Sequence, residues 1–247
     1  MRKYLWLGPA ILLFVWSILT YTGMIRPILL PEPHKVFLSL ISGLFGKGEL
    51  LKPLFKTCWI WILSFLVGSF IGVLLGVLAG YSDRVYSSFE VIIDFFRSLP
   101  SLLIVPIVII FFGIETLSAF IIISWTTFFY IFINTVYGVK YGRKSYLLVC
   151  KVLKIPKVKQ FTMIIFPSAL PYLFAGLRLG LSVALIVTIG IEMILGRAGL
   201  GGLVFDSFMA YDMTLIYAII VLVGILGYIS NKFLMNLEHR IIHWRGE

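Results

Sequence analysis

Apolar runs of about 20 residues recur along the chain, and short segments rich in charged residues separate them. A helix of that length crosses a hydrocarbon core of ~30 Å. The pattern predicts an all-α, polytopic membrane protein with about six transmembrane helices, at residues 5–22, 57–80, 89–113, 117–137, 168–195 and 213–235. No ten-residue alternation of apolar and polar positions is present, so the pattern does not predict a membrane β-barrel.

Composition agrees with this pattern. Hydrophobic residues make up 60% of the 247 residues and charged residues only 13%, whereas a soluble domain has about 25% charged residues. A soluble core with a polar coat is therefore excluded. The first apolar run follows "MRKY" and has no small-residue cleavage site after it. We expect it to be a retained span rather than a removed signal peptide.

The distribution of Lys and Arg predicts the orientation. Residues 138–167 carry seven basic residues and no acidic residue, and basic residues accumulate in cytoplasmic loops. We expect this loop, both termini and a tail at 236–247 to be cytoplasmic, and residues 23–56 to be external with an interfacial helix near 35–46. The same bias accounts for the net charge of +10, so no nucleic-acid partner is expected.

The basic loop contains a short amphipathic pattern. Leu147, Cys150 and Leu153 recur at spacings of three, and Pro156 should end the helix that they predict. Two interpretations stay open on these residues alone. The loop could lie on anionic lipid head groups, or it could dock a soluble partner.

Several motifs carry a resemblance to a known family. They include "LPEPHKV", "FFRSLPSLLIVPIVIIFFGIE", "IIFPSALPYLFAGLRLGLSVALIVTIGIEMI" and "GLGGLV". With this order and spacing, the chain resembles the binding-protein-dependent permeases of ABC importers, in their sulfonate, taurine and nitrate branch. The match extends over nearly the whole chain.

The resemblance implies a type I importer permease fold with a transmembrane helix and external segment at 1–56 and a permease core at 57–235. It also implies cytoplasmic ABC ATPase subunits that bind ATP and Mg, an external solute-binding protein, and a second permease copy, most simply as a homodimer in membrane lipid. The location would be the cytoplasmic membrane of a bacterium or archaeon. The cargo would be a small polar or anionic solute moved by alternating access. A pyrimidine vitamin precursor is an alternative cargo.

One departure from the family falls in the basic loop. In the family this loop carries Glu-Ala-Ala and then a glycine. Counted back from Pro167, those positions are Leu148, Val149 and Cys150, and the glycine position is Lys154. We expect Pro156 to supply the bend instead. The residues expected to couple to the ATPase are Leu147, Leu148, Cys150, Leu153, Lys154 and Pro156.

Glycines recur every four residues in the second predicted span, at Gly68, Gly72, Gly76 and Gly80. Four residues advance about 400° around a helix, so the glycines form a slowly drifting stripe. Small residues at such positions let another helix approach closely. We expect the stripe to serve helix packing rather than to contact a solute.

Four charged residues lie in or near predicted spans, where charges are costly and commonly functional. Asp94 and Arg97 are three residues apart and can pair on one helix face. Arg178 and Glu192 are about 21 Å apart along one helix, too far for contact. All four are candidates for a gate or pathway, beside the plainer alternatives of ion pairs and interfacial charges.

No enzyme site is predicted. His34, His239 and His243 lack a metal-binding pattern, and Cys58 and Cys150 fall on opposite sides of the predicted membrane. We expect no catalytic residue, no metal site and no cofactor bound by this chain. A secondary transporter is a rival function, but it would need coupling-ion ligands at mid-membrane and commonly an internal repeat, and neither is visible.

Overall fold

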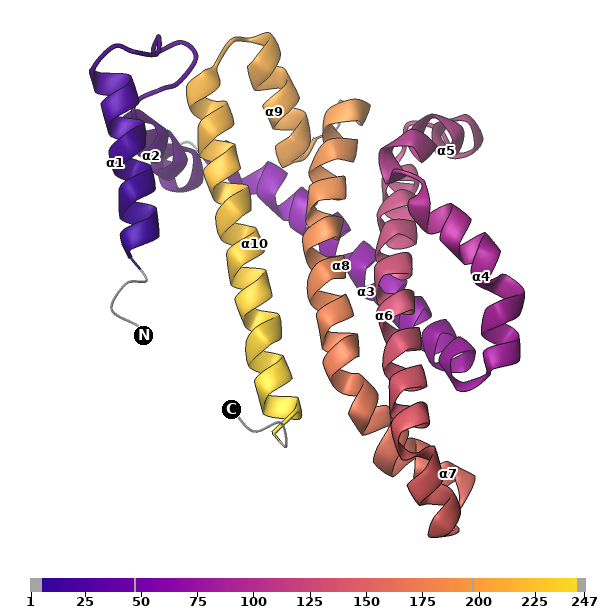
Figure 1. Cartoon of the computed structure of the whole chain (residues 1–247). Coiled ribbons are helices and arrows are strands. Elements are labelled where there is room, and N and C mark those ends of the chain that lie inside the picture. The colour runs from indigo at the N-terminus through magenta and orange to yellow at the C-terminus, as the bar shows by residue number, and fades with distance from the viewer. Residues whose placement is uncertain (1–5, 47, 197, 244–247) are drawn as a thin grey trace. The chain divides into compact units, whose positions relative to one another are not determined.

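The computed structural model describes residues 6–46, 48–196 and 198–243, and for Arg143, Ser145, Leu147 and Leu148 it describes the backbone alone. The described residues form helices and contain no strand, which confirms the all-α prediction (Figure 1). The α-helices are α1 (Leu7–Tyr21), α2 (Pro33–Ile41), α3 (Leu51–Tyr81), α4 (Asp83–Ser98), α5 (Val105–Phe112), α6 (Thr116–Val152), α7 (Lys157–Gln160), α8 (Phe166–Leu195), α9 (Leu200–Met209) and α10 (Met213–Ile241). A 3-10 turn (Ser101–Ile104) precedes α5, and π-helical turns follow α2 (Ser42–Gly46) and α7 (Phe161–Ile165).

The chain forms two compact units. Unit 1 comprises residues 1–57 and 192–226, and unit 2 comprises residues 58–191 and 227–247. Unit 1 therefore holds α1, α2, α9 and part of α10, whereas unit 2 holds α4 to α7 and most of α3 and α8.

Four described helical segments are long and apolar enough to cross a membrane, at Leu51–Tyr81, Thr116–Gly142, Lys157–Leu195 and Met213–Ile241. They correspond to four of the six predicted spans. The first predicted span contains α1, whose 15 described residues extend about 22 Å, less than a bilayer core. The predicted tail begins inside α10, which continues to Ile241, and residues 244–247 lie outside the described residues.

The third predicted span is not one straight helix, which corrects the sequence prediction. Its helical part begins earlier, at Asp83, and the pair Asp83–Ser98 and Ser101–Phe112 is bent by 89°. Leu99 and Pro100 between them have extended backbones. Proline disfavours the helical conformation of the residue before it and cannot donate a backbone hydrogen bond, so the helix stops there.

The amphipathic helix expected near Leu147 is not a separate element. It is instead the last part of α6, which continues for 37 residues to Val152. Glycines at 138 and 142 do not interrupt α6 because α8 packs against both. A Cβ atom added to Gly138 would lie 2.9 Å from Tyr172 Cβ, and one added to Gly142 would meet Ser168.

The glycine stripe of α3 lies against α6 in unit 2. A Cβ atom at Gly68 would lie 2.5 Å from the Ser124 carbonyl oxygen, and one at Gly72 would lie 3.0 Å from the Phe128 carbonyl oxygen. Gly76 and Gly80 meet α6 in the same way. The two backbones thus approach so closely that no side chain fits between them, a packing typical of membrane helices.

Threonine hydroxyls in α6 are satisfied within the helix itself. Thr127 donates to the Ile123 carbonyl and Thr135 to the Ile131 carbonyl, each at 2.8 Å, and both threonines are buried. A buried hydroxyl without a partner would cost several kcal/mol in an apolar medium. These two threonines therefore present their methyl groups to neighbouring helices with their hydroxyl protons paired, whereas the buried Ser124 hydroxyl of the same helix has no partner among the described residues.

Replacing Gly72 with leucine should weaken the fold, because the side chain must displace the α6 backbone. We expect a loss of about 1–3 kcal/mol, the usual cost of overpacking, seen as a lower midpoint of thermal unfolding in detergent. Gly224→Leu is the matched control, because nothing lies within 4 Å of a Cβ atom at Gly224 in α10. Equal stability of the two variants would contradict the close packing of α3 on α6.

Candidate functional site

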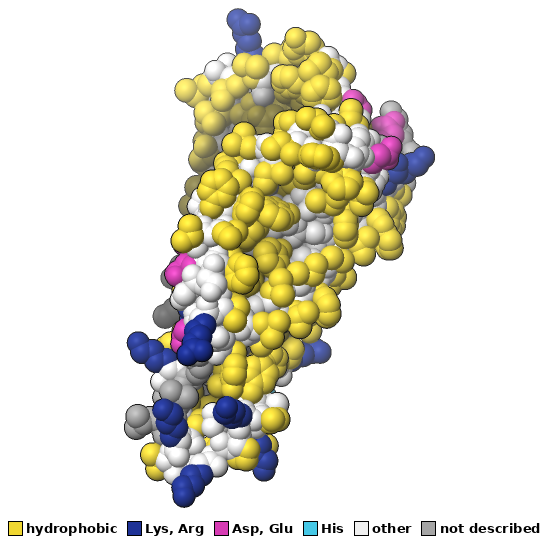
Figure 2. Space-filling view, turned by 90° about the vertical axis from the view of Figure 1, so that its right-hand side faces the viewer, with side chains coloured by type: hydrophobic (Ala, Val, Ile, Leu, Met, Phe, Trp, Pro, Cys, Tyr) yellow, Lys and Arg dark blue, Asp and Glu magenta, His cyan; other side chains and the backbone are white. Residues whose placement is uncertain are grey.

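The hairpin between α6 and α8 presents apolar side chains among lysines. Val152, Leu153 and Val158 are 73%, 65% and 75% exposed. In Figure 2, dark-blue Lys and Arg side chains gather at the lower end of the drawn face, whereas hydrophobic side chains cover most of the rest. Exposed apolar residues rimmed by charge are typical of a protein docking surface. Leu147 and Leu148, also expected here, have side chains outside the described part.

The bend of the hairpin is made at Lys154. Its φ is 49°, in the left-handed region that glycine adopts most readily. The Lys154 amide donates to the Lys151 carbonyl (3.2 Å) and the Ile155 amide to the Cys150 carbonyl (3.0 Å). These two bonds form a Schellman motif that ends α6, with lysine in the place that glycine usually takes.

The family that the chain resembles has a glycine, and the resemblance places that glycine at Lys154. The backbone at Lys154 thus has a conformation that glycine favours. Pro156, which was expected to bend the chain, instead precedes α7 in an extended conformation. Cys150 is only 2% exposed, so its side chain packs inside the hairpin rather than on its surface.

Arg178 pairs with a residue that the sequence did not single out. Its Nη1 lies 3.3 Å from Glu238 Oε2 of α10, within unit 2. The pair lines a cavity of 530 Å³, together with residues that include Tyr141, Tyr146 and Tyr172. Arg178 and Glu238 are 60 positions apart in sequence, so no local spacing could have indicated the contact.

Glu192 is buried and holds the start of α9, within unit 1. It is 7% exposed and accepts hydrogen bonds from the Thr57 hydroxyl at 2.8 and 3.0 Å and from the Gly201 amide at 3.0 Å. Thr57 in turn accepts from the Leu200 amide at 2.8 Å. The carboxylate thus lies at a helix N-terminus, where amide donors and the helix dipole favour negative charge. Gly199 leaves room for it, since a Cβ atom there would overlap the carboxylate.

Asp94 and Arg97 form an ion pair near the end of α4. Asp94 Oδ1 lies 3.1 Å from Arg97 Nε, and both side chains are about half exposed. The structure therefore brings these two candidates together. Arg178 has its own partner, Glu238, in unit 2, and Glu192 has Thr57 in unit 1.

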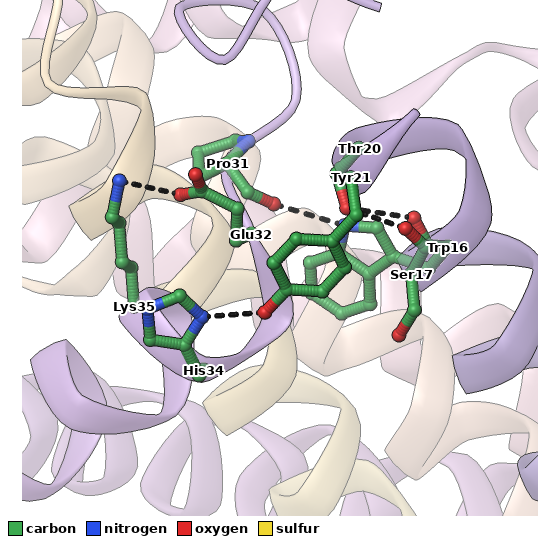
Figure 3. Close-up of polar contacts among 8 residues, drawn as sticks. All are labelled: Trp16, Ser17, Thr20, Tyr21, Pro31, Glu32, His34 and Lys35. Atoms are coloured by element: carbon green, nitrogen blue, oxygen red, sulfur yellow. Dashed lines mark hydrogen bonds and ion pairs between the residues drawn. The ribbon is translucent and has the colours of Figure 1, made fainter. Parts of the chain in front are cut away.

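Polar contacts tie α1 to the segment before α2, within unit 1 (Figure 3). Trp16 Nε1 donates to the Pro31 carbonyl at 3.0 Å, and the Tyr21 hydroxyl lies 2.7 Å from His34 Nδ1. Lys35 Nζ lies 2.6 Å from Glu32 Oε2, and this contact lowers the pKa of Glu32 below its usual value. The Tyr21 contact thus links α1 to His34 of α2 itself.

Among the described residues, no three His, Cys, Asp or Glu side chains lie together in a group that could hold a metal ion. The two cysteines are free thiols.

Comparison with known proteins gives consistent matches. Residues 68–243 match the family described as binding-protein-dependent transport system inner membrane component. The chain is 27% identical to a putative aliphatic sulfonates transport permease protein of Bacillus subtilis, over 99% of this chain and 90% of the relative. It is 29% identical to a nitrate import permease protein of Synechocystis (94% and 86% covered) and 28% identical to a bicarbonate transport system permease protein of Synechococcus elongatus (93% and 86%).

A solved structure shares the fold. The MetNI methionine ABC transporter in an inward-facing conformation matches with a TM-score of 0.66, over 80% of this chain and 96% of the matched chain. The sequence identity is 18%, so this likeness concerns the fold alone.

Replacing Lys154 with glycine should stabilise the hairpin, because lysine is held in a left-handed conformation that costs a non-glycine residue about 1 kcal/mol. We expect the midpoint of thermal unfolding to rise. Lys151→Gly is the matched control, since a glycine inside the last turn of α6 should destabilise by about 1 kcal/mol. A drop in stability for both variants would contradict the assigned bend.

Replacing Thr57 with valine should destabilise the start of α9, because the Leu200 amide loses its acceptor and Glu192 loses a donor. The expected loss is about 1–3 kcal/mol, the cost of buried polar groups without partners, measured by thermal unfolding. Thr162→Val serves as the control, since the exposed Thr162 hydroxyl bonds only to its own helix. Equal midpoints of thermal unfolding for the two variants would show that Thr57 does not hold the start of α9.

Proposed function

We propose a transport mechanism from one premise: the chain belongs to the family of binding-protein-dependent transport system inner membrane components, the membrane-spanning subunits of ABC importers. It is thus a multi-pass permease and not the ATP-hydrolysing enzyme. We propose that two copies, or one copy and a close relative, enclose a path for a small solute, with both termini cytoplasmic in the membrane of a bacterium or archaeon.

The hairpin between α6 and α8 is the observation that carries the proposed coupling. Its exposed apolar residues Val152, Leu153 and Val158 are flanked by Lys151, Lys154 and Lys157. In an importer of this kind a cytoplasmic ATPase would bury these apolar side chains, and acidic residues of the ATPase would meet the lysines. Cys150 and the Schellman motif keep the hairpin rigid, so that it transmits force.

The proposed transport cycle changes the packing of helices and makes no covalent bond. ATP and Mg would be bound by the ATPase subunits, whose closure moves the hairpins. The external binding protein would deliver the solute while the path faces outward, and ATP hydrolysis would return it to the inward-facing state. The bent pair of α4 and α5 offers a natural hinge, because its two halves share no continuous helix.

The cargo that we propose is a small solute with an oxyanion group. The names of three relatives refer to sulfonates, nitrate and bicarbonate, which share charged oxygen atoms but differ in shape. This shared chemistry supports an anionic cargo without selecting one compound.

The double change Leu153→Asp and Val158→Asp tests the hairpin. It should abolish co-purification with the ATPase and ATP-driven uptake, because two charges would lie in an apolar interface. Insertion into the membrane and thermal stability should be unchanged. The matched control is His239→Asp, an exposed charge change at the end of α10, which should keep the ATPase bound. Uptake without any ATPase would instead favour a secondary transporter.

A further inference from the structure

A polar cavity lies at the break of the bent helix pair, within unit 2. Its volume is 220 Å³. The end of α4 and the start of the 3-10 turn form one side, and α6 forms the other, with Val183 of α8. The lining residues are Phe96, Arg97, Ser98, Leu99, Pro100, Ser101, Trp125, Thr126, Phe129, Tyr130 and Val183.

The extended backbone at Leu99 and Pro100 lies in the lining of this cavity. Within a bilayer, non-helical backbone is tolerated only where protein buries it or where it lines a hydrated cavity. Arg97 is 14 residues beyond the start of α4, about 21 Å along that helix. The break therefore lies at the opposite end of α4 from Asp83.

Arg97 is the charged group in the lining of the cavity, and its ion-pair partner Asp94 lies outside the lining. Arg97 is the one ionisable side chain among the lining residues that is charged at neutral pH, and all of those residues belong to the described part of the chain. Asp94 holds the guanidinium through Nε at 3.1 Å and does not itself line the cavity. The four N–H groups on the two terminal nitrogens can therefore serve a ligand, in a geometry that suits two oxygen atoms at once.

Hydroxyl groups also line the cavity. Thr126 donates to the Ile122 carbonyl at 2.8 Å, as other threonines of α6 donate within that helix, and its oxygen lies 2.7 Å from Ser101 Oγ, whose proton it accepts. Tyr130 adds a phenolic O–H to the lining. The aromatic wall is fixed by edge-to-face contacts of Trp125 with Phe96 (5.3 Å) and with Phe129 (4.9 Å).

The other two described cavities lack this chemistry. In the cavity of 530 Å³, the charge of Arg178 is matched by Glu238, which lines the same space. The cavity of 260 Å³ in unit 1 is lined by Leu12, Val15, Trp16, Leu19, Leu30 and Tyr217. The Trp16 and Tyr217 polar atoms are already bonded to backbone carbonyls of the segment before α2.

We propose that the cavity at the break of α4 binds the oxyanion group of the transported solute, with Arg97 as the main ligand and Tyr130 as a further donor. This inference rests on the proposed function, since it assigns the solute a binding station within the permease. The volume suits a solute smaller than a typical drug-sized ligand. Specificity for oxyanions follows from a lining rich in donors that contains no carboxylate.

Binding to the purified permease tests the proposal without the ATPase. The probes are sodium nitrate, sodium hydrogencarbonate and sodium methanesulfonate, compared with sodium gluconate at equal ionic strength. At least one probe should raise the midpoint of thermal unfolding in a saturable way. Nitrate also quenches tryptophan fluorescence, so a saturable part of its quenching should disappear in Trp125→Phe.

Arg97→Gln should weaken the apparent affinity by about tenfold or more, because it removes charged hydrogen bonds, while Arg97→Lys should lose less. Arg84→Gln is the matched control, an exposed basic residue of α4 outside the cavity. Equal binding by wild type and Arg97→Gln, or no saturable effect of any probe, would overturn the proposal.

A second measurement separates this proposal from the proposed function. Arg97→Gln should still co-purify with the ATPase, but ATP-driven uptake should fall. If the wild-type chain does not co-purify with the ATPase, the proposed function is contradicted. The binding of the probes to the purified permease would still test the cavity. Undiminished uptake by Arg97→Gln would overturn the binding station and leave the transport function intact.

Discussion

A bilayer core supplies no hydrogen-bond partners, and this constraint explains the placement of polar groups in the chain. Buried threonines in α6 donate to carbonyls of their own helix. The free amides at the start of α9 meet Thr57 and Glu192. Where the backbone leaves the helical conformation, at Leu99 and Pro100, a polar cavity lies beside it. At these two places, a departure from a continuous helix is matched by side chains or by a polar space.

One helix connects the two regions to which we assign function. The first half of α6 lines the cavity through Trp125, Thr126 and Tyr130, and its last turn forms the hairpin. About 37 Å of continuous helix separates Thr126 from Lys151. Glycine contacts with α3 and α8 hold α6 on two sides. In our proposal, a displacement of the hairpin by the ATPase would therefore reach the cavity through a rigid element rather than through loops.

Much of the fold could be predicted from the sequence, because hydropathy and length alone define long membrane helices. Four predicted spans correspond to such helices. The sequence analysis predicts a single span across Leu99 and Pro100, because apolar runs lie on both sides of these residues. The proline was nevertheless a usable signal for the bend. The extent of α6 was missed because an amphipathic pattern does not show whether a helix is separate or a continuation.

The candidate sites were less predictable, because their partners are distant in sequence. Asp94 and Arg97 could be paired from their spacing. Spacing could not predict that Arg178 pairs with Glu238. It could not predict the contact of Glu192 with Thr57 either, since these two residues lie 135 positions apart. At Lys154 the resemblance predicts a glycine position, and only the backbone shows that this lysine adopts a conformation that glycine favours.

The contact between Gly199 and Glu192 also limits how these two positions can evolve. The carboxylate occupies the volume that a methyl group at position 199 would need. A larger residue at position 199 is compatible only with a shorter or redirected side chain at position 192. Conversely, a shorter acidic side chain at position 192 would leave a void beside Gly199. Substitutions at the two positions should therefore arise as a correlated pair across divergent descendants, with single changes removed by selection.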